Sequence, residues 1–115
     1  MIRFYRAGFW AALVFVIVMA LLPQPPQLPG TSDKVQHVAA FATLAALGAA
    51  AFRSTSLIRL FASLLALGAV IEFLQAIPAL NRDSDPVDWI ADIIAAAVVL
   101  IAVWWLRSKK EGLSR

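Results

Sequence analysis

Apolar residues fill four long stretches of this chain, and short polar segments separate them. The stretches cover residues 8–22, 35–52, 57–77 and 87–106, each roughly 15 to 20 residues long, which suits a bilayer core about 30 Å thick. Alternation with a period of two is absent, and backbone groups at membrane depth must be satisfied within the structure, so these stretches predict helices. We expect an all-α integral membrane protein, a four-helix bundle forming one domain over residues 1–115.

Composition agrees with this class. Of the 115 residues, 62% are hydrophobic and only 15% are charged, far from the average of soluble domains. The chain has no cysteine, which excludes disulfides and thiolate metal sites.

The basic residues indicate how the helices are oriented. The net charge is +3, but the basic side chains lie at the ends of the stretches, so they indicate topology and not binding to nucleic acid. With the N-terminus in the cytoplasm, only Lys34 and Arg82 fall outside. The other eight fall on the cytoplasmic side: Arg3, Arg6, Arg53, Arg59, Arg107, Lys109, Lys110 and Arg115. The positive-inside rule therefore predicts both termini in the cytoplasm, for a multi-pass protein of a cell inner membrane.

The segments around the stretches carry further expectations. No small-x-small cleavage site follows Met19, so we expect the first stretch to be a retained span and not a signal peptide. Residues 23–30 contain four prolines and predict an outer loop. Residues 107–115 are expected to form a disordered basic cytoplasmic tail. The aromatic residues near the N-terminus are expected to anchor at the membrane interface: Phe4, Tyr5, Phe9 and Trp10.

Small residues predict close helix packing in the second stretch. Ala42, Ala46 and Ala50 recur at four-residue spacing, beside Ala45 and Ala49. Such a stripe lets two helix backbones approach closely in lipid.

Acidic residues gather at one corner of the chain. The segment from Glu72 to Asp92 holds five of the seven acidic residues, and Glu72 and Asp92 lie inside apolar stretches, where ionisable groups are expensive. At a rise of about 1.5 Å per residue, Glu72 and Asp92, and His37 when counted from Asp33, each lie about 6 to 9 Å inside the ends of their helices. Helical spacing puts Gln75 on the face of Glu72, and Asp88 on the face of Asp92. We therefore expect a polar cluster near the outer surface.

Prolines define the ends of the helices around this corner. Pro78 is expected to end the third helix, and Pro86 fits the first turn of the fourth, with Asp85 as its N-cap.

Three motifs in order resemble the VanZ-like membrane proteins, and the match covers most of the chain. Family members have Asp-Lys-x-x-His-x-x-x-Phe on the second span, Glu-x-x-Gln on the third, and then Arg-x-x-Asp-x-x-Asp. The matching positions are Asp33, Lys34, His37 and Phe41, then Glu72 and Gln75, then Arg82, Asp85 and Asp88. The family continues with Asn and Gly on the fourth span, where this chain has Asp92 and Ala95.

The resemblance implies a bacterial envelope protein, and it links the chain to tolerance of the glycopeptide teicoplanin. It also implies that the polar residues form a ligand site that faces the outer leaflet. The expected ligand-binding residues are Asp33, Lys34, His37, Glu72, Gln75, Arg82, Asp85, Asp88 and Asp92.

Three classes of function remain open for this cluster. In the first, Lys34 and Arg82 bind an anionic envelope lipid or glycan precursor, while proton transfer falls to His37, Glu72, Asp88 and Asp92. In the second, those same four residues bind a divalent metal ion. In the third, the cluster only fixes the bundle, and the protein is a structural accessory subunit of an envelope complex. Expected partners are membrane lipids and further copies or an envelope complex, and no cofactor is implied.

Overall fold

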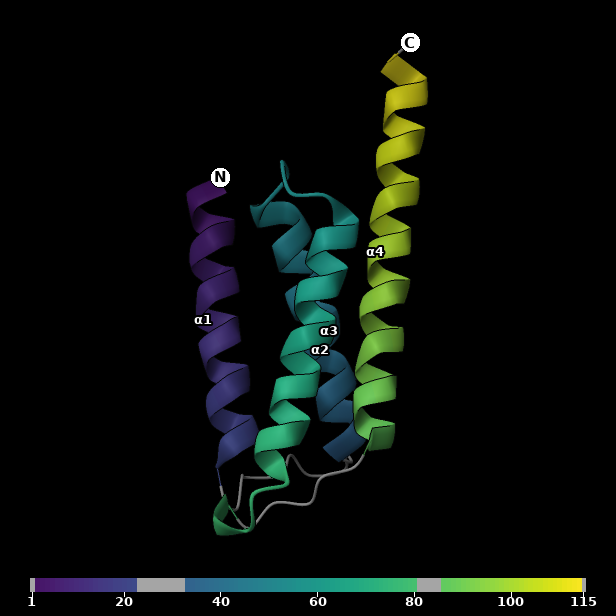
Figure 1. Cartoon of the computed structure of the whole chain (residues 1–115). Coiled ribbons are helices and arrows are strands. Elements are labelled where there is room, and N and C mark those ends of the chain that lie inside the picture. Colours follow the sequence, from purple (N-terminus) through teal and green to yellow (C-terminus); the bar gives the residue numbers. More distant parts are fainter. Residues whose placement is uncertain (1, 23–32, 81–85, 115) are drawn as a thin grey trace.

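The chain folds into a bundle of four antiparallel helices. The computed structural model describes residues 2–22, 33–80 and 86–114, which form α1 (Ile2–Leu21), α2 (Asp33–Ala51), α3 (Leu57–Gln75), the 3₁₀ helix η1 (Pro78–Leu80) and α4 (Pro86–Ser114). Neighbouring helices run in opposite directions, so both termini lie at the same end (Figure 1). The predicted all-α four-helix fold is confirmed.

The helices differ in length and in how apolar they are. Within the described residues, α1, α3 and α4 are each long and apolar enough to cross a membrane, and the apolar part of α2, Val35–Ala51, is shorter. Helix α2 lies within the bundle and contacts α1, α3 and α4, most extensively α4 and α1. Its neighbours cover much of α2, and a stripe formed by Val35, Ala39, Thr43 and Ala46 stays exposed.

The ends of the helices follow the local sequence. The Ser56 side chain accepts a hydrogen bond of 3.2 Å from the backbone N–H of Arg59 and so caps α3. Helix α3 ends at Gln75, shortly before Pro78, and α4 begins at Pro86. The predicted roles of both prolines are confirmed, while the expected outer loop at 23–30 and the N-cap Asp85 lie outside the described residues.

The C-terminal segment differs from the expectation of a disordered tail. Helix α4 continues to Ser114 and extends past the other three helices (Figure 1). Between Val87 and Glu111 it contains no proline or glycine, and Arg, Lys and Glu are good helix formers. The Lys109 ammonium also lies 4.9 Å from the centre of the Trp105 ring, one turn earlier. The prediction of disorder was therefore wrong for residues 107–114.

The core is centred on one face of α2. Phe41, Leu44, Ala45 and Ala49 are buried there, and a Cβ on Gly48 would lie 2.9 Å from Leu60 of α3. The small residues Ala45, Gly48 and Ala49 allow neighbouring helices to come into close contact with α2.

The predicted alanine stripe was partly wrong. Ala45 and Ala49 are buried, Ala42 and Ala50 are partly buried, and Ala46 is exposed. The contact face follows Phe41, Ala45 and Ala49, because the large Phe41 and Leu44 side chains fix which side of α2 faces inward.

Aromatic residues of α1 divide between core and surface. Phe9 is buried and packs edge-on against Phe52, with the ring centres 5.2 Å apart. Phe4 and Trp10 are exposed, as interfacial anchors would be. The prediction that Phe9 is an anchor was wrong. Phe9 lies on the inward face of α1 and points toward Gly48 of α2.

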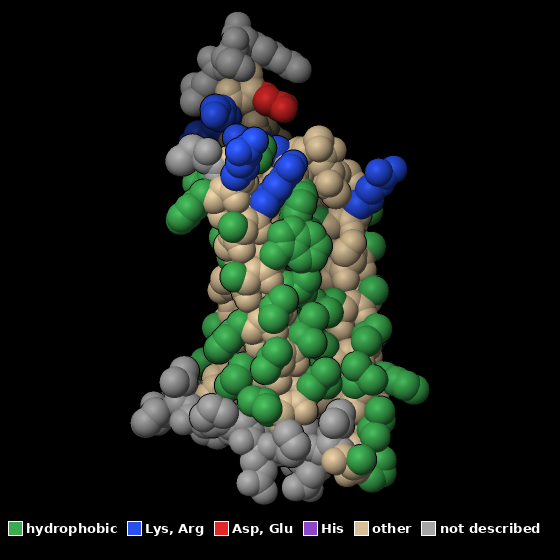
Figure 2. All heavy atoms as spheres, turned by 90° about the vertical axis from the view of Figure 1, so that its left-hand side faces the viewer, with side chains coloured by type: hydrophobic (Ala, Val, Ile, Leu, Met, Phe, Trp, Pro, Cys, Tyr) green, Lys and Arg blue, Asp and Glu red, His purple; other side chains and the backbone are tan. Residues whose placement is uncertain are grey.

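Two arginines bind the end of α2 from opposite sides. The Nε of Arg6 in α1 donates to the carbonyl of Ala51 at 3.1 Å, and an Nη of Arg107 in α4 donates to the carbonyl of Ala49 at 2.9 Å. The last carbonyls of a helix lack partners within it, and the negative end of the helix dipole favours cations. Lys and Arg side chains gather at this end of the molecule (Figure 2).

Helices α3 and α4 approach each other at Gly68. The Trp89 indole N–H of α4 donates to the carbonyl of Leu65 at 3.2 Å, and a Cβ on Gly68 would lie only 2.7 Å from Cδ1 of Trp89. The absence of a side chain at position 68 therefore lets the indole ring lie against the backbone of α3.

We predict that Gly68→Ala destabilises the bundle by about 1 to 3 kcal/mol, the usual cost of overpacking, because the new methyl group displaces Trp89. Thermal unfolding in detergent measures the effect. Gly112→Ala is the matched control, since its Cβ would meet no atom within 4 Å and alanine favours the helix. Equal melting temperatures for the two variants would contradict the close approach at Gly68.

Candidate functional site

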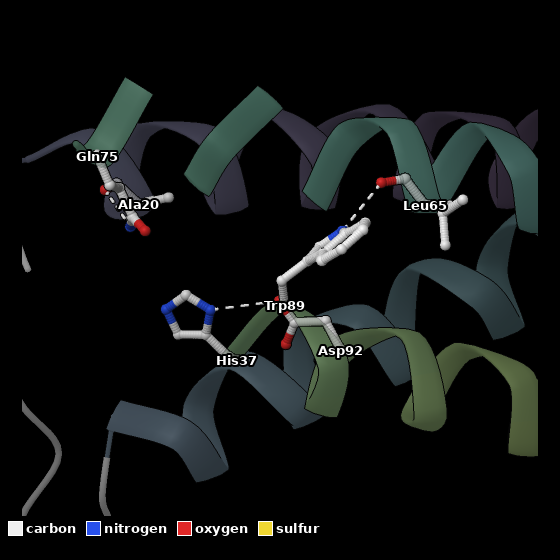
Figure 3. Close-up of polar contacts among 6 residues, drawn as sticks. All are labelled: Ala20, His37, Leu65, Gln75, Trp89 and Asp92. Atoms are coloured by element: carbon white, nitrogen blue, oxygen red, sulfur yellow. Dashed lines mark hydrogen bonds and ion pairs between the residues drawn. The ribbon is translucent and has the colours of Figure 1, made fainter. Parts of the chain in front are cut away.

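An ionisable pair joins α2 and α4 at the end of the bundle opposite the termini. The Nδ1 atom of His37 lies 3.5 Å from Oδ2 of Asp92, with side chains only 12% and 5% exposed (Figure 3). The two residues are 55 positions apart in sequence. Their expected approach is confirmed.

Two further acidic residues, Glu72 and Asp88, lie at the same end. Asp88 lies one turn before Asp92 on α4 and is also buried. Glu72 lies in the last turn of α3 and is half-buried. Each also takes part in a polar or electrostatic interaction of its own. Convergence of Glu72 and Asp88 on the His37–Asp92 pair stays a prediction.

Gln75 has a defined partner in α1. Its side chain is 1% exposed, and its Nε2 donates to the carbonyl of Ala20 at 2.9 Å (Figure 3). Ala20 lies in the last turn of α1, where carbonyls have no partner within the helix. Gln75, predicted as a ligand-binding residue, thus ties the ends of α1 and α3 together.

Of the four remaining predicted site residues, the structure describes the backbone of two. Asp33 and Lys34 form the start of α2, which brings them to the same end of the bundle as His37. Arg82 and Asp85 lie outside the described residues.

The predicted metal alternative lacks a suitable ligand geometry. Across residues 2–22, 33–80 and 86–114, no three His, Asp or Glu side chains gather closely enough to hold a metal ion. His37, Glu72, Asp88 and Asp92, which come from three helices, therefore do not form a metal-ligand set in the described part of the chain.

Three residues that join helices through hydrogen bonds were not predicted from the sequence. One lies near the His37–Asp92 pair, and two lie at the end of the bundle that holds the termini. Trp89, between Asp88 and Asp92, bonds to α3, and Arg6 and Arg107 bond to α2. A tryptophan inside an apolar stretch gives no signal of a specific acceptor. Arginines near helix ends indicate the orientation of the helices in a membrane. Their positions in the sequence do not identify the backbone carbonyl to which each one donates.

Comparison with protein families, with curated proteins and with solved structures found no match. The resemblance to VanZ-like proteins therefore depends on the three motifs alone.

We predict that His37 and Asp92 are energetically coupled. His37→Ala and Asp92→Ala should each destabilise the protein, and the double variant should lose less than the sum, with a coupling of about 0.6 to 1.7 kcal/mol, as found for polar pairs in membranes. A double-mutant cycle on unfolding in detergent measures this. Pairing His37→Ala with Val98→Ala is the control, since Val98 is 61% exposed and strict additivity is expected. Additivity of the His37 and Asp92 variants would rule out a stabilising contact.

Proposed function

We propose that this chain is a multi-pass protein of the bacterial inner membrane that binds or processes an anionic cell-envelope lipid or glycan precursor at the acidic end of its bundle. The observation that supports this proposal most strongly is the largely buried His37–Asp92 pair. Three apolar helices of sufficient length support the membrane setting.

The nature of the pair favours a functional site. Four side-chain hydrogen bonds between helices, from Arg6, Gln75, Trp89 and Arg107, end on backbone carbonyls, which a bundle in lipid must satisfy in any case. The His37–Asp92 contact satisfies no backbone group. It keeps an imidazole and a carboxylate within a membrane protein, where ionisable groups are expensive and usually serve function.

The residues supply distinct chemical roles. A histidine beside a carboxylate can accept or release a proton near neutral pH, so His37 and Asp92 are the proposed proton-transfer residues. Lys34 and Arg82 are proposed to hold the anionic group of the ligand, and Asp88 and Glu72 complete the site. Tolerance of teicoplanin follows from the resemblance to VanZ-like proteins and is part of the same proposal.

A structural role is the second candidate, and the Gln75–Ala20 bond favours it. One residue of the predicted site already serves to join two helix ends. If the whole corner acts in this way, the protein is an accessory subunit of an envelope complex, with no chemistry of its own.

We propose that both termini face the cytoplasm, which puts the acidic end at the outer leaflet. The basic residues of α1, α4 and the turn before α3 lie at the end that holds the termini, as the positive-inside rule requires. An alkaline phosphatase fused after Arg115 should stay inactive, and a cytoplasmic reporter at the same place should be active. Periplasmic phosphatase activity, or cleavage of this end by external protease, would reverse the orientation.

We predict that Glu72→Gln and His37→Ala leave the protein inserted but reduce teicoplanin tolerance to that of cells lacking the gene. The structural candidate instead predicts that tolerance falls only as far as the abundance of each variant in the membrane falls, because losing one partner of a buried polar contact costs about 1 to 3 kcal/mol. Susceptibility, abundance in membranes and melting temperature in detergent are measured together. The control is Val98→Ala, on the exposed face of α4. Variants that are stable and keep full tolerance would refute the functional site.

A further inference from the structure

An apolar groove runs between α3 and α4 at the end opposite the His37–Asp92 pair. It has a volume of about 310 Å³. Its lining is entirely hydrophobic and comes from the start of α3 and the middle of α4: Leu57, Ile58, Phe61, Ala97, Leu100, Ile101 and Trp104. Leu100 is buried, whereas Ile58, Ile101 and Trp104 are more than half exposed, at 82%, 64% and 61%, so the groove is open to the surroundings of the bundle.

Cationic side chains lie just beyond one end of this groove. Leu57 is the first residue of α3 and follows the turn that carries Arg53. On α4, Trp104 is followed within two turns by Arg107, Lys109 and Lys110. The groove therefore leads from an apolar interior to the basic end of the molecule, with a tryptophan at the boundary.

We propose that this groove binds one acyl chain of an anionic phospholipid whose headgroup lies among the basic side chains at this end. An acyl chain matches a wholly apolar groove that opens sideways between two helices long enough to span a membrane. Tryptophan is favoured at the level of lipid headgroups, and each Lys or Arg near the surface attracts anionic lipid by about 1 kcal/mol, or about fivefold in affinity.

Charge also distinguishes lipid from a second copy of the chain. Two copies in one membrane with the same orientation, packed through this groove, would bring their basic ends together. Like charges would repel there, whereas an anionic lipid neutralises them. The inference is independent of the proposed ligand site, because Trp104 lies twelve residues beyond Asp92, about 18 Å along α4.

The test uses the full-length protein in a mild detergent with phosphatidylglycerol or phosphatidylcholine, and native mass spectrometry to measure bound lipid. The wild-type protein should retain phosphatidylglycerol over phosphatidylcholine. Lys109→Gln with Lys110→Gln should lower phosphatidylglycerol affinity by about fivefold for each cation removed, with little change for phosphatidylcholine. Equal retention of the two lipids by the wild type would overturn the proposal.

Groove-filling variants test the acyl-chain site directly. Ala97→Phe should abolish retention, while Val98→Phe, on the neighbouring exposed position outside the groove, should retain lipid as the wild type does. If Ala97→Phe does not fold, Ile101→Gln and Val98→Gln form a second pair, since both positions are similarly exposed, and only the first should lose lipid. Undiminished retention by the groove variant, or a wild-type dimer that this variant dissociates, would overturn the proposal.

Discussion

Carbonyl groups at helix ends set the main constraint on this bundle. The last carbonyls of a helix have no partner within that helix, and in this bundle side chains of other helices reach several of them. Arg6 and Arg107 do so for α2, and Gln75 does so for α1. These contacts tie helix ends together at both ends of the molecule. They also fix the height of α2 relative to its neighbours, and hence the height of His37.

The small residues of α2 and α3 complete this arrangement. Gly48 lets Leu60 and Phe9 approach α2, and Gly68 lets Trp89 lie against α3. Trp89 lies between Asp88 and Asp92 in sequence, so its bond to Leu65 restrains the rotation of α4 about its axis. Asp92 consequently faces α2, where it meets His37. The ionisable pair thus depends on the packing of Trp89, less than one turn from Asp92, and on a glycine of a third helix.

Much of the fold could be predicted from the sequence, because it depends on local patterns. Apolar runs, Pro78 and Pro86 defined the helices, and the positions of His37 and Asp92 predicted their approach. Errors arose where packing decides between positions with equal local preference. Ala46 and Ala45 are the same residue type, and only tertiary contacts expose one and bury the other. Similarly, nothing near Gln75 in sequence indicates that its amide bonds to Ala20.

The uninterrupted course of α4 has a mechanical consequence. From Val87 to Glu111 neither proline nor glycine offers a hinge, so bending or twisting this segment means straining backbone hydrogen bonds. Asp92 and Lys109 are seventeen residues apart, about 26 Å along the axis. Both residues belong to one continuous helix, so a rotation of one end about the helix axis is coupled to the other end. A rotation of α4 imposed near Lys109 would therefore also act on Asp92.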